Sequence, residues 1–164
     1  MTLKEIELND GNHFVAMEYY KLILNRTFII LITEDKIIGL LGNGTISVEG
    51  GKDILTKQIS KQFAIRGDLS NPYSYLKEKY INEIENDNIN SEKILLKNKM
   101  NFVINRKDIK DVNYNPKKKF GMGYYPHDGR VTIETNDGKK REFIILGNQS
   151  GIEIADIIRK NDFN

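Results

Sequence analysis

The sequence contains no cysteine and no tryptophan, and it has only two histidines and three prolines. Without cysteine there are no disulfides, thiolate metal sites or cysteine nucleophiles, and two histidines leave little material for an imidazole metal site. The longest apolar run, Phe28 to Ile32, has five residues, far below the ~18 that a membrane-spanning helix needs. The N-terminus is acidic where a signal peptide would be apolar. These absences predict a cytoplasmic protein without cofactor or metal.

The composition is that of an ordinary folded chain. Its 164 residues suit one domain spanning 1–164. Charged residues make up 29% and hydrophobic residues 39% of the chain, which excludes a disordered or membrane-embedded protein. Lys and Arg total 25 against 23 Asp and Glu, a net charge of +2. This balance gives no overall signal for binding nucleic acid.

The first third of the chain is typical of β-strands. Residues 28–33 and 36–41 are β-branched and apolar on both sides of a short acidic break, which predicts two strands buried on both faces or forming a barrel wall. Gly42-Asn43-Gly44 predicts a turn, and residues 45–48 a returning strand. Residues 14–24 are interpreted as a strand, with a helix as the open alternative.

Residues 50–92 are interpreted as a helical insertion. Residues 53–62 have the spacing of a short helix. A second helix is predicted to start at Asn71-Pro72, with Asn71 as its cap and Pro72 in its first turn. Its apolar stripe has helical spacing and consists of Tyr73, Leu76, Tyr80 and Ile84. This stripe either packs the insertion onto the sheet or docks a partner protein.

The second half returns to strands and ends in a helix. Short strands are predicted at 101–105, 108–114, 130–135 and 142–146, the last two joined by the hairpin signature Asn136-Asp137-Gly138-Lys139. A final helix starts at Ser150 and carries an apolar stripe of isoleucines at 154, 157 and 158. The fold class is therefore α+β: a mainly antiparallel sheet or barrel with a helical insertion and a C-terminal capping helix.

The order of these motifs resembles a known superfamily. Two segments carry the resemblance. Residues 28–41 predict a strand, the step Thr33-Glu34-Asp35 and a second strand. Residues 104–158 predict a strand with Asp108-Ile109 and Val112, a strand starting at Gly129, an Asp-Gly-Lys hairpin and the closing helix. This order is similar to the pleckstrin-homology-like superfamily in its broad bacterial and GRAM-like sense. The resemblance implies a small, strongly bent antiparallel barrel with one open end plugged by the C-terminal helix.

The resemblance does not extend to phosphoinositide recognition. Members that bind phosphoinositides carry clustered Lys and Arg around their first hairpin. Here that region offers only Lys21, Arg26 and Lys36, so this recognition is not expected. The scaffold hosts lipid, peptide and protein binding, and a function has to be argued from a site.

Positive charge is concentrated between residues 93 and 119, where nine basic and two acidic residues give a local charge of +7. The plain interpretation is a solvated loop and strand face. The functional one is a surface attracted to anionic lipid or an acidic protein. The sequence thus predicts a non-enzymatic binding or scaffolding module that meets an anionic membrane surface or acidic partner. The basic surface proposed for this contact consists of Lys117, Lys118, Lys119, Lys139, Lys140 and Arg141.

Three further patterns have alternative explanations. Phe120 and Tyr125 follow the lysine run and are expected in the core of a strand, although exposed aromatics beside lysines would suit a membrane interface. The pair His127-Asp128 could serve a small enzyme as general base, but a type I turn explains it, and both histidines are expected on the surface. A protein–protein module would use Tyr73, Leu76 and Tyr80.

Overall fold

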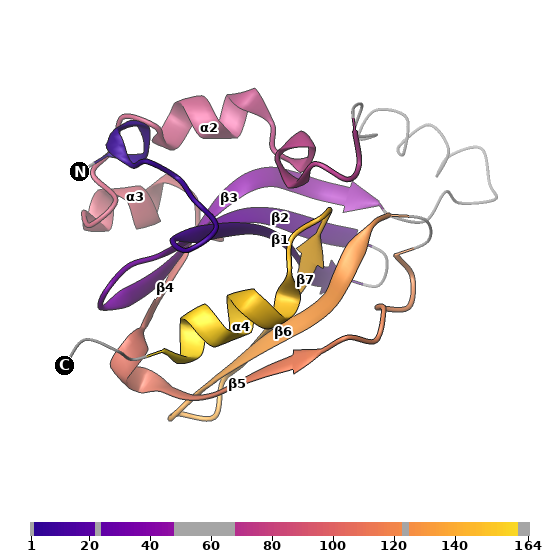
Figure 1. The fold of residues 1–164 in the computed structure, drawn as a ribbon. Coiled ribbons are helices and arrows are strands. Elements are labelled where there is room, and N and C mark those ends of the chain that lie inside the picture. Colours follow the sequence, from indigo (N-terminus) through magenta and orange to yellow (C-terminus); the bar gives the residue numbers. More distant parts are fainter. Residues whose placement is uncertain (1, 22–23, 48–67, 123–124, 161–164) are drawn as a thin grey trace.

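The described residues form one antiparallel sheet of seven strands, curled into a half-barrel, with helices on both faces (Figure 1). The computed structural model describes residues 2–21, 24–47, 68–122 and 125–160. The strand order is β4-β3-β2-β1-β7-β6-β5. The strands are β1 (His13–Lys21), β2 (Leu24–Ile32), β3 (Lys36–Ser47), β4 (Phe102–Asn105), β5 (Ile109–Asn115), β6 (His127–Thr135) and β7 (Lys140–Leu146).

Short helical elements account for the rest of the regular structure in the described residues. They are η1 (Leu3–Glu5), η2 (Pro72–Tyr75), α2 (Glu78–Ile84), α3 (Glu92–Lys97), η3 (Arg106–Asp108) and α4 (Gly151–Arg159). The α+β class, the helical insertion and the C-terminal helix are as predicted, and residues 14–24 belong mainly to a strand. None of the helices in the described ranges is long and apolar enough to cross a bilayer.

The concave face of the sheet holds the main core. Even-numbered residues of β1 and β2 point inward, as a period of two requires, and they meet inward residues of β6 and β7. α4 lies across this face and contacts β5 and β6 (Figure 1). Its predicted stripe is confirmed, since Ile154 and Ile158 are buried and Ile157 packs against the same core.

The convex face is covered by the insertion and the N-terminus. Ile29, Leu31, Ile38 and Leu40 of β2 and β3 pack there against buried residues of α2, α3 and η1. Figure 1 shows α2 and α3 on the side of the sheet away from α4. Both faces of β2 and β3 are therefore buried, which explains their almost continuous apolar sequence.

The predicted turn at Gly42-Asn43-Gly44 is wrong, because β3 continues through these residues to Ser47. A Cβ atom on Gly42 would collide with Leu76, and one on Gly44 would lie 2.7 Å from the Tyr80 hydroxyl. Glycines stand here because another segment approaches the strand closely. The register of the β2–β3 pairing shifts on both sides of Thr27, so β3 stays paired with β2 through the glycine segment.

The single helix predicted from Asn71 is also interrupted. Asn71 does cap the segment, because its side chain accepts a 3.0 Å hydrogen bond from the Tyr73 amide. The helix it starts is the short η2, and Leu76 and Lys77 are extended before α2 begins. The Lys77 amide donates to the Gly42 carbonyl at 2.8 Å, so β3 holds the chain at the break. The helix predicted at 53–62 lies outside the described residues.

Arg106 joins three segments at one end of the half-barrel. It lies in the +7 stretch of the sequence, yet it is only 7% exposed. Its guanidinium donates to the Thr33 carbonyl at 3.1 Å, and to the carbonyls of Ile157, Ile158 and Lys160 at the end of α4. A cation at a helix C-terminus satisfies free carbonyls and interacts favourably with the helix dipole.

Replacing Arg106 with methionine should therefore destabilise the protein by about 2–4 kcal/mol, because several buried carbonyls lose their donor. Urea unfolding measures this difference. The matched control is Lys107→Met, which changes an exposed neighbour and should stay within about 0.5 kcal/mol of the wild type. Equal stability of the two variants would contradict the role assigned to Arg106.

Candidate functional site

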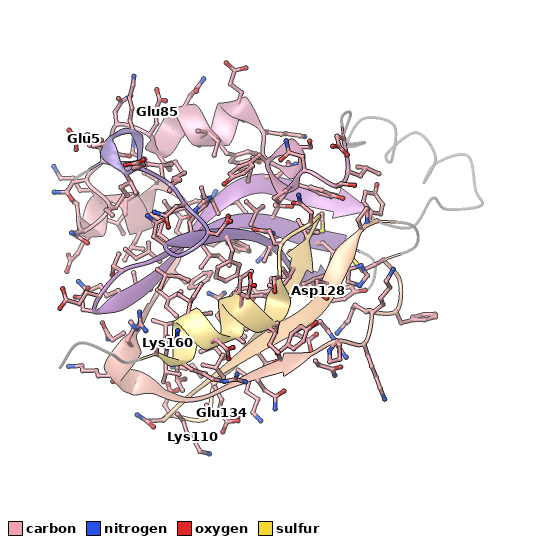
Figure 2. The ribbon with its side chains drawn as sticks, viewed as in Figure 1. Glu5, Glu85, Lys110, Asp128, Glu134 and Lys160 are labelled. Carbon is pink, nitrogen blue, oxygen red and sulfur yellow. The ribbon has the colours of Figure 1, made fainter. Side chains whose placement is uncertain are left out.

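The six basic residues singled out from the sequence lie at two ends of one strand. Lys117, Lys118 and Lys119 precede β6, whereas Lys139, Lys140 and Arg141 follow it, the last two as the first residues of β7. β6 has nine residues, so its ends are about 27 Å apart. Asp128 and Glu134, labelled in Figure 2, mark these two ends. The structure does not bring the two groups together into one surface.

The hairpin end of β6 carries cations that are all paired. Lys139 pairs with Asp137 at 2.5 Å and Lys140 with Glu134 at 2.7 Å. Arg141 donates to both carboxylate oxygens of Glu18, at 3.0 and 3.2 Å. The Arg141 guanidinium also stacks on Phe102, 3.6 Å from the ring centroid. These positive charges are neutralised within the protein.

The ion pairs shift the pKa values of the carboxyls. Hydrogen bonds from Lys110 and then Lys140 lower the pKa of Glu134 to about 2. Hydrogen bonds from Lys139 and Thr135 lower the pKa of Asp137 to about 2. The pKa of Lys139 is raised by its bond to Asp137. Opposite charge and hydrogen bonding favour the ionised form of each partner.

The loop between β5 and β6 has a different character. Lys117 and Lys118 are exposed, and within the described part of the chain neither forms an ion pair. Phe120 is 93% exposed, so the expectation that it lies in the core is wrong. Tyr125 is buried, as expected, although it lies in the loop just before β6. The loop therefore presents an aromatic ring next to two unpaired cations.

The Phe120 side chain is exposed because contacts of the residues around it fix the backbone of the loop. The Lys119 amide donates to His127 Nε2 at 3.0 Å, and the Tyr19 hydroxyl donates to the Phe120 carbonyl at 2.5 Å. The Lys119 side chain turns back, pairing with Glu142 at 2.5 Å and lying 4.7 Å from the Tyr19 ring centroid. Met122 is buried two residues later. Because its neighbours are held inward, the Phe120 side chain points to solvent.

His127 has a structural role in this anchoring. It is 7% exposed, so the expected surface position is wrong, and His13 is buried as well. Because the Lys119 amide can only donate, Nε2 must accept, and Nδ1 carries the proton and donates to the Tyr125 carbonyl at 3.0 Å. Both ring nitrogens are thus engaged by the backbone. No signal in the local sequence distinguishes this buried histidine from a turn residue.

Asp128 is engaged separately from its neighbour His127. It accepts hydrogen bonds from the Tyr114 hydroxyl at 2.9 Å and from the Gly151 amide at 2.8 Å. The register of β6 against β7 shifts between His127 and Arg130, and Gly129 has a φ of +63°. This bulge turns Asp128 toward the first residue of α4. The pair is therefore not aligned as an acid–base couple.

The three residues of the alternative partner surface contact the protein itself. Tyr73 is half exposed, and its hydroxyl hydrogen-bonds to His13 Nε2. Leu76 packs against two of the hydrophobic clusters. Tyr80 packs against the main core beside Gly44. Their contacts hold the insertion against the sheet.

The other cations of the +7 stretch are spread over different elements. Lys97 of α3 pairs with Asp87 at 3.1 Å on the convex side. Lys110 lies on β5, the edge strand farthest from β4 in the sheet order, and pairs with Glu134 at 2.8 Å. Arg106 is buried between them in the chain. In the described ranges, no three His, Cys, Asp or Glu residues come together in a way that could hold a metal ion.

The hairpin ion pairs predict an unusual titration. Glu134 should titrate near pH 2 rather than 4.5 in a carbon-detected NMR titration. A pKa lowered by folding stabilises the protein above the unfolded value, and this contribution is lost as the pH falls from about 4.5 to about 2. Lys140→Gln should raise the pKa of Glu134, whereas Lys139→Gln, which removes a partner of Asp137, should not. A wild-type value near 4.5 would contradict the pairing.

Two comparisons were made with protein-family models and with curated proteins. No protein-family model matches the sequence, and no curated protein matches it at a significant level. The architecture is therefore defined here by its strand order and by the C-terminal helix on the concave face, and not by membership of a family. Any function for the chain has to come from its own geometry.

Proposed function

We propose that this protein is a non-enzymatic binding module that contacts an anionic membrane surface through the tip of the β5–β6 loop, residues 117–120. The observation that carries the proposal is the 93% exposure of Phe120 beside the unpaired Lys117 and Lys118. At a membrane interface an aromatic ring enters the headgroup region while lysines meet anionic headgroups. The proposal does not use Lys139, Lys140 and Arg141, because their charges are paired.

Exposure of one apolar side chain is common and does not by itself indicate a site. Leu96 on α3 is 82% exposed, but the next residue, Lys97, is paired with Asp87. Lys93 and Lys99, three positions before and after Leu96, also form no ion pair in the described residues, so Phe120 differs because anchors on both sides hold it outward beside its two free cations. This combination supports a membrane contact at the loop.

The expected affinity is low. Burying a Phe side chain contributes about 2 kcal/mol, and each lysine near an anionic surface contributes about 1 kcal/mol. The sum of about 4 kcal/mol corresponds to a dissociation constant near 1 mM. The contact would therefore be reversible and sensitive to salt, and stable attachment would need a second contact or several copies.

We also propose a distant relationship to the pleckstrin-homology-like superfamily and a cytoplasmic location. The strand order β4-β3-β2-β1-β7-β6-β5 and the C-terminal helix on the concave face support the relationship. Anionic lipids are concentrated in the cytoplasmic leaflet, which supports the location.

Co-sedimentation with vesicles tests the contribution of the aromatic ring. Wild-type protein should bind vesicles rich in phosphatidylserine at low salt and should bind neutral phosphatidylcholine vesicles far less. Phe120→Ser should weaken binding to the anionic vesicles about thirtyfold, as expected for the loss of about 2 kcal/mol. Because Phe120 is exposed, its replacement should leave the unfolding midpoint unchanged. Equal binding to both lipids, or to neither, would overturn the proposal.

Charge reversal tests the location of the contact. Lys117→Glu/Lys118→Glu should abolish binding to anionic vesicles, because attraction becomes repulsion. The matched control is Lys139→Glu/Lys140→Glu, which changes the net charge equally at the other end of β6. If the two double variants lost binding equally, overall charge rather than the β5–β6 loop would be responsible.

A further inference from the structure

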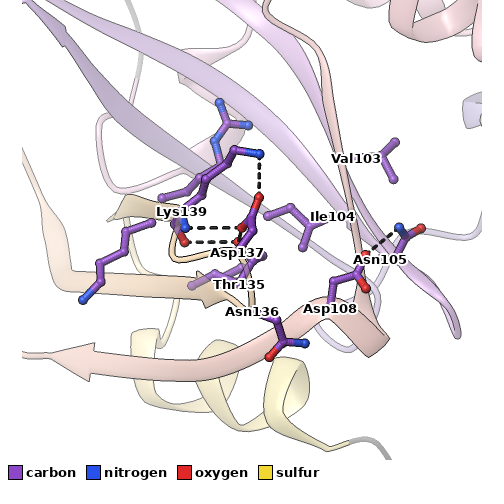
Figure 3. A pocket seen from close by; sticks show the side chains of 11 residues that line it. Val103, Ile104, Asn105, Asp108, Thr135, Asn136, Asp137 and Lys139 are labelled. Carbon is purple, nitrogen blue, oxygen red and sulfur yellow. Dashed lines mark hydrogen bonds and ion pairs between the residues drawn. The ribbon is translucent and has the colours of Figure 1, made fainter.

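A slot opens where the half-barrel fails to close, between edge strand β4 and the β6–β7 hairpin (Figure 3). β4 pairs only with β3, and β5, the other edge, pairs only with β6. The volume of the slot is about 730 Å³, within the usual range for small-molecule sites. This slot is separate from the β5–β6 loop, since the hairpin lies at the other end of β6.

The floor of the slot is apolar. Ile104 and Ile133 line it and also belong to the main core, where both are buried. Val103, which is half-buried, extends this apolar surface along β4. A ligand entering from the rim would cover chiefly Val103 and the edge of Ile104, because Ile133 is only 1% exposed, and covering apolar surface favours the transfer of the ligand from water.

The rim offers one cation that can change partner. Lys139 pairs with Asp137 at 2.5 Å, and its side chain is 83% exposed, so this ion pair contributes little to stability. Asp137 also accepts hydrogen bonds from the Thr135 hydroxyl at 2.5 Å and the Lys139 amide at 3.3 Å. Asp137 therefore keeps partners if the Lys139 ammonium group turns to a ligand.

The other two cations of the slot already have carboxylate partners, and Arg141 is the more firmly held. Arg141 is fixed by two bonds to Glu18 and by the Phe102 ring. Lys140 is bonded to Glu134. Lys139 has the more exposed side chain of the two lysines, 83% against 63%, so it is the cation best placed to turn to a ligand, and it can neutralise one negative charge.

Two carboxylates in the lining limit the charge of the ligand. Asp108 and Asp137 both line the slot, and Figure 3 shows them on its two sides. Asp108 already accepts a hydrogen bond from the Asn105 side chain at 2.9 Å. A second negative charge on a ligand would face these carboxylates in a partly enclosed space, where repulsion is stronger than in water.

We propose that this slot binds a small amphipathic monocarboxylate. Its carboxylate pairs with the Lys139 ammonium group, and its apolar chain lies over Val103 and the edge of Ile104. The slot discriminates against dianionic groups such as a phosphate monoester, because Asp108 and Asp137 repel the second charge. This binding activity does not depend on the membrane contact of the loop.

The test uses decanoate as the probe and the full-length protein labelled with ¹⁵N. Decanoate should shift the amide signals of residues 103–105 and 133–141, with an affinity at least tenfold higher than that of decanol. Decyl phosphate should bind more weakly than decanoate. Lys139→Gln should reduce the affinity for decanoate about tenfold, whereas Lys107→Gln, an exposed cation outside the lining, should leave it unchanged.

Three results would overturn the proposal: signal shifts confined to other regions, equal affinity for decanol, or unchanged binding by Lys139→Gln. A preference for decyl phosphate would refute the selection by charge. Both lysine variants replace exposed side chains and should fold normally. Lys117→Glu/Lys118→Glu should bind decanoate like the wild type, so failure at the slot and failure at the membrane are distinguishable.

Discussion

The bonds of the Arg106 guanidinium hold the half-barrel in its observed shape. They connect the β2–β3 turn with the end of α4, while η3, which contains Arg106, joins the two edge strands. The other end of α4 is fixed by Asp128 at the start of β6. A helix held at both ends fills the concave face without closing the sheet. The sheet therefore stays open at the slot beside β4.

Electrostatic pairing gives the two ends of β6 different properties. At the hairpin, Lys139, Lys140 and Arg141 are each paired with a carboxylate, Lys140 sharing Glu134 with Lys110, and an ion pair on the surface leaves little net charge to attract a partner. At the loop, only Lys119 is paired, and the two lysines before it remain free. Two lysine groups that are equivalent in the sequence are thus different in the fold. The loop is the better candidate for long-range attraction, and the hairpin is better suited to recognition at short range.

Local patterns predicted most of the secondary structure, because strand runs, the Asp-Gly hairpin and the Ser150 cap depend on neighbouring residues. The errors arose where distant residues decide the structure. Glycine permits a turn and also permits close approach of another segment; at Gly42 and Gly44 the approaching residues are Leu76 and Tyr80, more than thirty positions away. The break after η2 has the same origin, because the Lys77 amide bonds to the Gly42 carbonyl.

Site residues are harder to predict than strands, because charge and hydrophobicity do not tell which side chains find partners. Arg106 and Lys117 look alike in the sequence, but carbonyl groups from two distant segments bury the first and leave the second exposed. Phe120 and Met122 are equally apolar, and the loop buries only Met122, because Tyr19 bonds to the Phe120 carbonyl and His127 bonds to the Lys119 amide. Tyr19 lies about a hundred residues before Phe120, so no local pattern reveals its contact. Which polar groups remain unpaired after folding is therefore a property of the tertiary structure, and both proposals rest on it.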